Sequence, residues 1–158
     1  MKLPLLILIV FLLNGCLVTN DSQMPETSIK TSVKVDGKIE ELVLLNEHKI
    51  NSKLTVELIK KGFKVKPFIS QQQVTEKSEN REIKYNQSSA RFGIKINSDY
   101  NGMTCVFSSN RVEEFTFTLI DLKSNDIVDI FEKRGPTGKC PPLTPIYEIY
   151  SNYLNGYK

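Results

Sequence analysis

The feature that most constrains this chain is an apolar run near its start, from Leu3 to Leu13, preceded by the single charge of Lys2. The run has 11 residues. A membrane-spanning helix needs about 20 residues, and the apolar core of a secretion signal has about 7–15. We therefore interpret the run as a signal core, and no later stretch is long and apolar enough to span a membrane. The fold must then be built by the residues that follow it.

The residues directly behind the run are Asn14, Gly15 and Cys16. A small residue followed by a cysteine resembles the lipobox of bacterial lipoproteins, in which the cysteine receives lipid and becomes the first mature residue. The resemblance covers residues 1–16, and Asn14 departs from the small or hydroxyl residue usual at its position. It implies that residues 1–15 are a signal peptide and that Cys16 is the lipidation site. An ordinary cleaved signal and an uncleaved anchor are the alternatives.

The same resemblance implies a location. Lipobox cysteines carry several acyl chains, palmitate among them, and two or more chains anchor a protein stably where one would be reversible. Leu17 follows the cysteine, whereas an Asp there would resemble the inner-membrane retention signal of enteric bacteria. For a Gram-negative source, we therefore expect a lipid-anchored protein on the periplasmic face of the outer membrane.

The mature chain would keep about 143 residues, which suits one domain with a real core. Its net charge would be +2 without Lys2. This charge is too small, and too evenly interspersed, to indicate a nucleic-acid partner. Residues 16–37 are mostly polar and predict a lipidated cysteine with a flexible tether, and residues 38–158 predict a single globular periplasmic domain.

Two cysteines remain in the mature chain, Cys105 and Cys140. Because the compartment behind a secretion signal is oxidising, we expect a disulfide, with two buried thiols as the alternative. The bond would close a loop of 36 residues, counting both ends, and chain entropy gives it about 3–4 kcal/mol of stabilisation. We expect no metal site and no cofactor, since CxxC spacing is absent and one histidine cannot complete four ligands.

The sequence of the first half of the domain predicts strands on either side of a helix. Residues 29–35 alternate enough for a weak edge strand, and residues 42–45 form a short apolar run typical of a strand buried on both faces. A helix is expected at about 52–61, capped by Asn51 or Ser52 and ended by Gly62. Residues 63–69 return as a strand, and Pro67 indicates that this strand lies at an edge or is broken there. Residues 70–89 are polar, with a helical turn expected near 71–76, and could be the contact loop.

The second half predicts a meander over residues 90–131. Alternating apolar residues mark strands at 92–96 and 115–119, and Asn101-Gly102 is a strong hairpin signal that would pair residues 103–107 back. Further turns are expected at 108–110 and 123–126. A helix at about 145–155 should follow, with Thr144 as its cap and Pro145 at its first position. The fold class is therefore α+β, a mainly antiparallel sheet packed against two helices, with one disulfide.

Candidate chemistry is sparse. His48 is the only histidine and lies in a polar turn, so we expect a surface residue; no serine has the GxSxG context of a hydrolase nucleophile. The stretch from Gly135 to Cys140 has two residues between its glycines and a cysteine after its lysine, which excludes a phosphate-binding P-loop. We therefore expect no enzyme. A hydrolase acting without histidine is a third, weaker hypothesis.

Five lysines could form a basic patch for an anionic partner such as a glycan, a lipid headgroup or an acidic protein. A solvated helix face is the alternative interpretation. The lysines are Lys53, Lys60, Lys61, Lys64 and Lys66.

The segment Leu58-Ile59-Lys60-Lys61-Gly62-Phe63-Lys64-Val65 and the later hairpin from Leu119 to Val128 resemble periplasmic lipoprotein domains. These domains include activators of peptidoglycan synthases and the curli-assembly lipoprotein, and the likeness covers about residues 42–131. It implies a non-catalytic accessory or assembly factor that binds an envelope protein or polymer. An inhibitor or exclusion factor against a foreign hydrolase or phage protein is the alternative.

Overall fold

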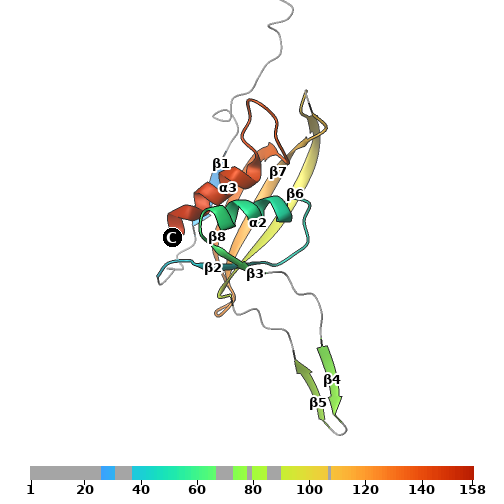
Figure 1. The fold of residues 1–158 in the computed structure, drawn as a ribbon, viewed down its shortest axis with the longest axis vertical. Helices are drawn as coiled ribbons and strands as arrows, with labels where there is room; N and C mark the ends of the chain where they lie inside the picture. Colours follow the sequence, from blue (N-terminus) through green and yellow to red (C-terminus); the bar gives the residue numbers. More distant parts are fainter. Residues whose placement is uncertain (1–25, 31–36, 67–72, 78–79, 85–89, 107) are drawn as a thin grey trace, which may run out of the picture.

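The computed structural model describes residues 26–30, 37–66, 73–77, 80–84, 90–106 and 108–158, and it shows an α+β fold, as predicted (Figure 1). The predicted lipidation site, Cys16, lies outside the described residues. The elements in chain order are β1 (Glu26–Lys30), β2 (Glu41–Leu44), α2 (Asn51–Lys60), β3 (Lys64–Lys66), β4 (Gln73–Lys77), β5 (Asn80–Lys84), β6 (Phe92–Thr104), β7 (Arg111–Asp121), β8 (Asp126–Pro136), α3 (Ile146–Leu154) and the 3₁₀ turn η2 (Asn155–Tyr157).

The main sheet has six strands in the order β1-β8-β7-β6-β2-β3. β6, β7 and β8 form the predicted antiparallel meander, and β2 lies parallel to both β6 and β3. β3 is an edge strand, as Pro67 predicted. β2 lies inside the sheet, between β6 and β3, and it is buried on both faces as predicted: Leu42, Val43 and Leu44 are all buried.

Helices α2 and α3 both cover one face of this sheet (Figure 1). The alternation along β7 sends Phe115, Phe117 and Leu119 toward the helices, because side chains of a strand point to opposite faces in turn. Phe117 stacks on Tyr150 of α3, with ring centroids 3.9 Å apart. Leu54 and Leu58 of α2 complete the same core. The buried face of α3, with Ile146, Tyr150 and Leu154, completes this apolar layer between sheet and helices.

The Asn101-Gly102 pair is not the hairpin turn that its sequence predicts. β6 runs through it, pairing Tyr100 with Glu113 and then Met103 with Val112, with a register shift between the two pairs. Gly102, at φ +88°, takes the backbone conformation that this bulge needs. The chain stays extended because Val112 and the disulfide lie beyond the bulge and hold both strands there. The reversal comes later, at residues 105–110, and Phe107 lies outside the described residues.

The sequence predicted the C-terminal end of α2 correctly but not its N-terminal cap. The C-terminal prediction is confirmed: Gly62 has φ +83°, its N–H donates to Ile59, and Phe63 donates to Leu58. The N-terminal cap prediction is wrong. Neither Asn51 nor Ser52 is the cap, since Ile50 occupies that position without a side-chain hydrogen bond. The Asn51 amide donates instead to the carbonyl of Asn46, at 2.8 Å.

The start of α3 also differs by one residue from the prediction. Pro145 is the N-cap, with extended backbone angles, and not the first helical residue; Thr144 does not cap the helix. The cause is the fixed φ of proline, which suits either position, so the packing of Ile146 against Gly135 decides where the helix begins. Ile146 is fully buried.

Two segments expected to be irregular or helical are strands. Glu26–Lys30 falls within the predicted tether and overlaps the weak edge strand expected at 29–35 by two residues; it forms the edge strand β1, paired antiparallel with β8, and residues 31–36 lie outside the described residues. Gln73–Lys77 overlaps the helical turn expected at 71–76, yet it pairs with Asn80–Lys84 as a separate two-stranded sheet. In both cases a partner strand supplies the hydrogen bonds that the local sequence does not demand. The rest of the proposed contact loop lies outside the described residues.

Candidate functional site

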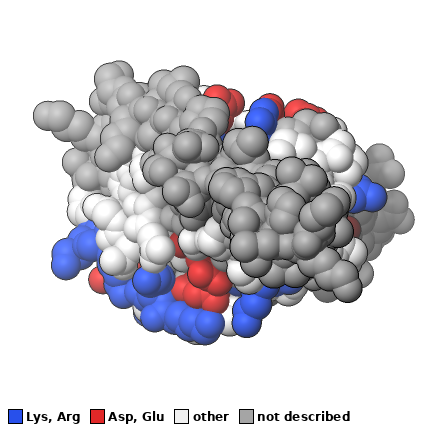
Figure 2. Space-filling view, turned by 90° about the horizontal axis from the view of Figure 1, so that it is seen from above, with Lys and Arg blue, Asp and Glu red and all other residues white. Residues whose placement is uncertain are grey.

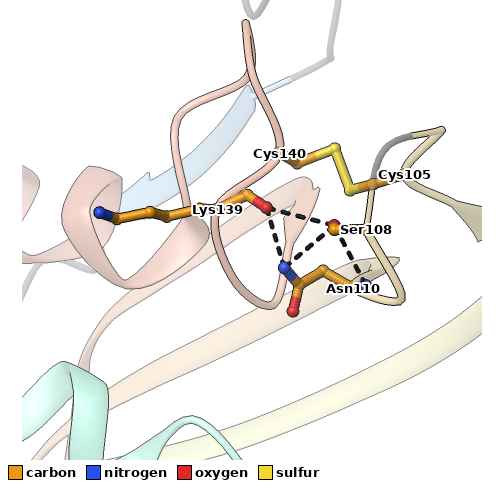
Figure 3. The surroundings of a disulfide bond; sticks show 5 residues. All are labelled: Cys105, Ser108, Asn110, Lys139 and Cys140. Atoms are coloured by element: carbon orange, nitrogen blue, oxygen red, sulfur yellow. Dashed lines mark hydrogen bonds between the residues drawn. A yellow bond between two sulfur atoms is a disulfide. The ribbon is translucent and has the colours of Figure 1, made fainter.

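The predicted disulfide is present. Cys105 directly follows β6, and Cys140 lies in the loop after β8; their Cα atoms are 5.7 Å apart, within the usual range for a bridge. Figure 3 shows that the two loops are also joined by hydrogen bonds at the carbonyl of Lys139, which accepts from Asn110 at 2.8 Å and from Ser108 at 3.3 Å. The bond therefore ties the loop after β8 to the β6–β7 reversal.

The five lysines of the predicted patch lie on α2 and β3, but several of their charges have partners. Lys60 is paired with Glu57 at 2.7 Å, and Lys66 with Glu41 at 2.8 Å. Lys53 donates to the carbonyl of Thr137 at 3.0 Å. The remaining two, Lys61 and Lys64, lie at the C-cap of α2 and the start of β3. The patch is consequently less basic than its sequence suggests.

A polar cluster that the sequence did not predict lies where the β2–α2 connection meets β6 and β7. We call it the Glu113 cluster; its members are His48, Lys49, Ser98 and Glu113. Glu113 has a side chain only 1% exposed, and it forms an ion pair with Lys49. Ser98 donates to the other carboxylate oxygen at 2.8 Å, and His48 Nε2 lies 3.0 Å from Ser98 Oγ. The cluster satisfies a buried carboxylate, which would otherwise be costly.

His48 is half-buried rather than a fully exposed surface residue, and its neighbours fix its tautomer. The N–H of Ile50 donates to Nδ1 at 3.4 Å, so the ring proton is on Nε2 and is donated to Ser98. Ser98 in turn donates to Glu113. In a hydrolase the serine donates to the histidine and the carboxylate holds the histidine. The order here is reversed, because Ser98 donates to the carboxylate and His48 donates to Ser98.

The charges of the cluster are set by the same contacts. Burial would raise the pKa of Glu113, but hydrogen bonds from Lys49 and Ser98 outweigh it and lower the pKa below its ordinary value. Burial, followed by the nearby Lys49 charge, lowers the pKa of His48. Glu113 is therefore ionised and His48 neutral at neutral pH. The sequence did contain one signal for Glu113, because it continues the inward phase of Phe115 and Phe117 by two residues.

Two open hollows flank this region. One lies beside the Glu113 cluster; the other, which we call the open-face hollow, is about 340 Å³ in volume. Its lining carries both signs of charge, with an ion pair between Arg134 and Glu114 and a 3.3 Å hydrogen bond from Thr116 to Glu132. The first hollow is lined by Glu47, His48, Lys49, Asn51 and Ser52. The open-face hollow is lined by Asp99, Glu114, Phe115, Thr116, Glu132, Lys133 and Arg134.

The end of the β6–β7 hairpin carries exposed apolar side chains. We call Tyr100, Met103 and Val106 the apolar tip; they are 45%, 44% and 77% exposed. The Arg111 guanidinium lies over the Tyr100 ring, 4.8 Å from its centroid. Figure 2, which looks down from the upper end of Figure 1, shows basic and acidic side chains next to one another on the described surface, not a field of one sign.

Within the described ranges, no group of three or more potential metal ligands is found. No helix among the described residues is long and apolar enough to cross a membrane. These two findings concern only the part of the chain that the structure describes.

Comparisons with known proteins add little. No protein-family model matches the chain, and no curated protein matches it. Among solved structures it is similar to a dodecamer of PelC from Paraburkholderia phytofirmans, at 13% identity and a TM-score of 0.46. It is similar to a dodecamer of a PelC variant from the same organism at 15% identity and a TM-score of 0.44. Each match covers 84% of this chain and 94% of the other. At these scores the likeness carries no conclusion about function.

Proposed function

We propose that this protein is a lipid-anchored envelope lipoprotein without catalytic activity, which binds a protein or an envelope polymer as an accessory or assembly factor. The observation that carries the proposal is the Gly15-Cys16 pair behind an apolar run of signal length. The disulfide between Cys105 and Cys140 supports it, because such bonds form and persist in oxidising compartments outside the cytoplasm. The outer membrane is the proposed location.

The absence of catalysis is proposed on the chemistry of the Glu113 cluster. This cluster unites the single histidine with a serine and a carboxylate, the residue types of a hydrolytic site. Its hydrogen bonds run from His48 through Ser98 to Glu113, so they stabilise a buried charge. The arrangement supports a structural role for these residues and a binding role for the protein.

We propose the open-face hollow as the contact surface. Its polar groups come from three neighbouring strands and present donors and acceptors of both signs. Such a surface suits a partner recognised through hydrogen bonds rather than through net charge, for example a polar envelope polymer or a protein strand. The mild net charge of the chain agrees with this choice.

Lipidation is tested by replacing Cys16 with Ser and fractionating cells grown with labelled palmitate. We expect label in the wild-type chain, none in the variant, and loss of the variant from the outer membrane. A variant that stays in the outer membrane as before, together with an unlabelled wild type, would refute the anchor.

The partner is tested by pull-down from crosslinked envelopes. Recovery of a resident envelope protein or glycan supports the accessory role. Recovery of nothing resident, with capture of a foreign hydrolase or phage protein, would favour the inhibitor. Thr116→Arg should fill the open-face hollow and abolish recovery, while Ser124→Arg, in the exposed turn before β8, should not.

A further inference from the structure

The register of β1 shows at which end of the sheet the ordered domain begins. Glu26 pairs with Lys133 and Lys30 pairs with Asp129. β8 continues from Lys133 to Pro136, which pairs with Val112 beside the β6–β7 reversal. Three residues of strand correspond to about 10 Å. The chain segment that leads from Cys16 therefore reaches the domain at the end of the sheet that carries the apolar tip.

The length of that segment limits the distance to a lipid anchor. Nine residues separate Cys16 from Glu26. A chain of this length spans about 35 Å at most when fully extended, and about 17 Å on average as a coil. If Cys16 carries lipid, the end of the sheet nearest Glu26 stays close to the bilayer surface.

The apolar tip has the composition of a membrane-surface contact. Met103 and Val106 are exposed aliphatic side chains, and Tyr100 adds a ring with a polar end, which favours the boundary between lipid and water. The cation that accompanies them is Arg111, whose guanidinium lies over the Tyr100 ring, whereas the side chain of the exposed Lys139 points away from Cys105 (Figure 3). Such a cation suits anionic headgroups. Asp99, next to Tyr100, is the exposed acid nearest in sequence.

The other exposed large apolar side chains among the described residues lie elsewhere. Val56 and Ile59 are on α2, and Ile127 is at the opposite end of the sheet, beside the turn between β7 and β8. Among the exposed apolar side chains of the described sheet strands, those of the apolar tip thus lie toward the end of the sheet at which β1 begins.

We propose that the apolar tip inserts into the headgroup region of the bilayer that holds the lipid on Cys16. The domain would then contact the membrane with its disulfide-closed end, which is the β6–β7 reversal and the loop after β8 joined by the Cys105–Cys140 bond. This inference rests on the proposed lipid anchor and adds an orientation to it. It leaves the open-face hollow on the side of the sheet away from the helices, accessible from the periplasm.

The experiment uses a property of the chain itself, which contains no tryptophan. Val106→Trp places a single fluorophore at the most exposed position of the tip, and Ile127→Trp is the matched control at the opposite end. Both lipidated full-length proteins are reconstituted into vesicles with phospholipids brominated near the headgroup. We expect a blue shift and strong quenching for the tip probe, and neither for the control. Tyr100→Trp is a second tip probe if Val106→Trp misfolds.

Each alternative result has a separate meaning. If both proteins carry lipid and float with the vesicles but the tip probe is not quenched, the orientation is refuted and the anchor stands. If the tip probe responds only to added envelope protein and not to vesicles, the tip is a protein contact and the inference is wrong. If the chain carries no acyl group and does not float, the proposed function fails and this inference fails with it.

Discussion

The inner layer of the domain and its disulfide-closed end are held together by different means. The inner layer is a large apolar core in which the rings of Phe117, Phe131 and Tyr150 lie against one another between sheet and helices. The disulfide-closed end has a separate small cluster of Cys105, Val112 and Cys140. This cluster buries little apolar surface. The loop after β8 and the β6–β7 reversal are held together mainly by the disulfide and by the hydrogen bonds to the Lys139 carbonyl. Each of the two regions is therefore stabilised by its own local contacts.

The largest effect is expected from the inner layer. Phe117→Ala should lower the free energy of unfolding by about 3–5 kcal/mol, because it removes a fully buried ring stacked on Tyr150 and leaves a cavity. Urea unfolding followed by circular dichroism measures this. Val56→Ala, on the exposed side of α2, is the control and should change stability by far less. Equal losses for the two variants would contradict the described core.

The next effect concerns the disulfide. Replacing both Cys105 and Cys140 by Ser should cost about 3–4 kcal/mol through the greater entropy of the unfolded chain. Hydrogen exchange should rise first at residues 105–110 and 137–143, while the amides of Phe117 and Phe131 stay protected. If exchange rose uniformly through the sheet, the two regions would not be separate units.

Glu113 lies between the two regions and should make stability depend on pH. Folding lowers its pKa below the ordinary 4.5, so its contribution is present above that pH and is lost as pH falls through the folded-state pKa. Glu113→Gln should therefore be less stable at neutral pH, by about 1–3 kcal/mol, and lose less stability on acidification. Glu47→Gln, an exposed neighbour, is the control. If the free energy of unfolding fell equally with pH in wild type and Glu113→Gln, the ionised Glu113 would not contribute to stability as described.

The smallest effect should come from Asn110. Asn110→Ala removes the hydrogen bond to the Lys139 carbonyl and should cost about 0.5–1.5 kcal/mol. Its consequence should be confined to the disulfide-closed end, seen as faster exchange at residues 137–140 with the bond intact. Asn97→Ala, on an exposed position of β6, is the matched control. Faster exchange in α2 or α3 would mean that the two regions are coupled.

The sequence predicted local structure correctly where a short pattern is compatible with a single conformation. Gly62 and Phe63 end α2 as predicted, because a left-handed residue followed by an apolar one satisfies the last carbonyls of a helix. The alternation at residues 115–119 predicted that one face of β7 is buried. The expected export to an oxidising compartment predicted the Cys105–Cys140 bond. The α+β class followed from these elements. The signal at Cys16 and the location that it implies stay predictions.

What only the tertiary structure decided involves partners distant in sequence. Asn101-Gly102 can turn a hairpin or form a bulge, and the pairing of Met103 with Val112 selected the bulge. β1 is a strand because β8 has an edge to pair with. The hydrogen bonds of the Glu113 cluster join residues that are 15, 50 and 64 positions apart along the chain. Short-range patterns determine conformation where one residue suffices, whereas strand partners, register and buried charges depend on contacts that exist only after the chain has folded.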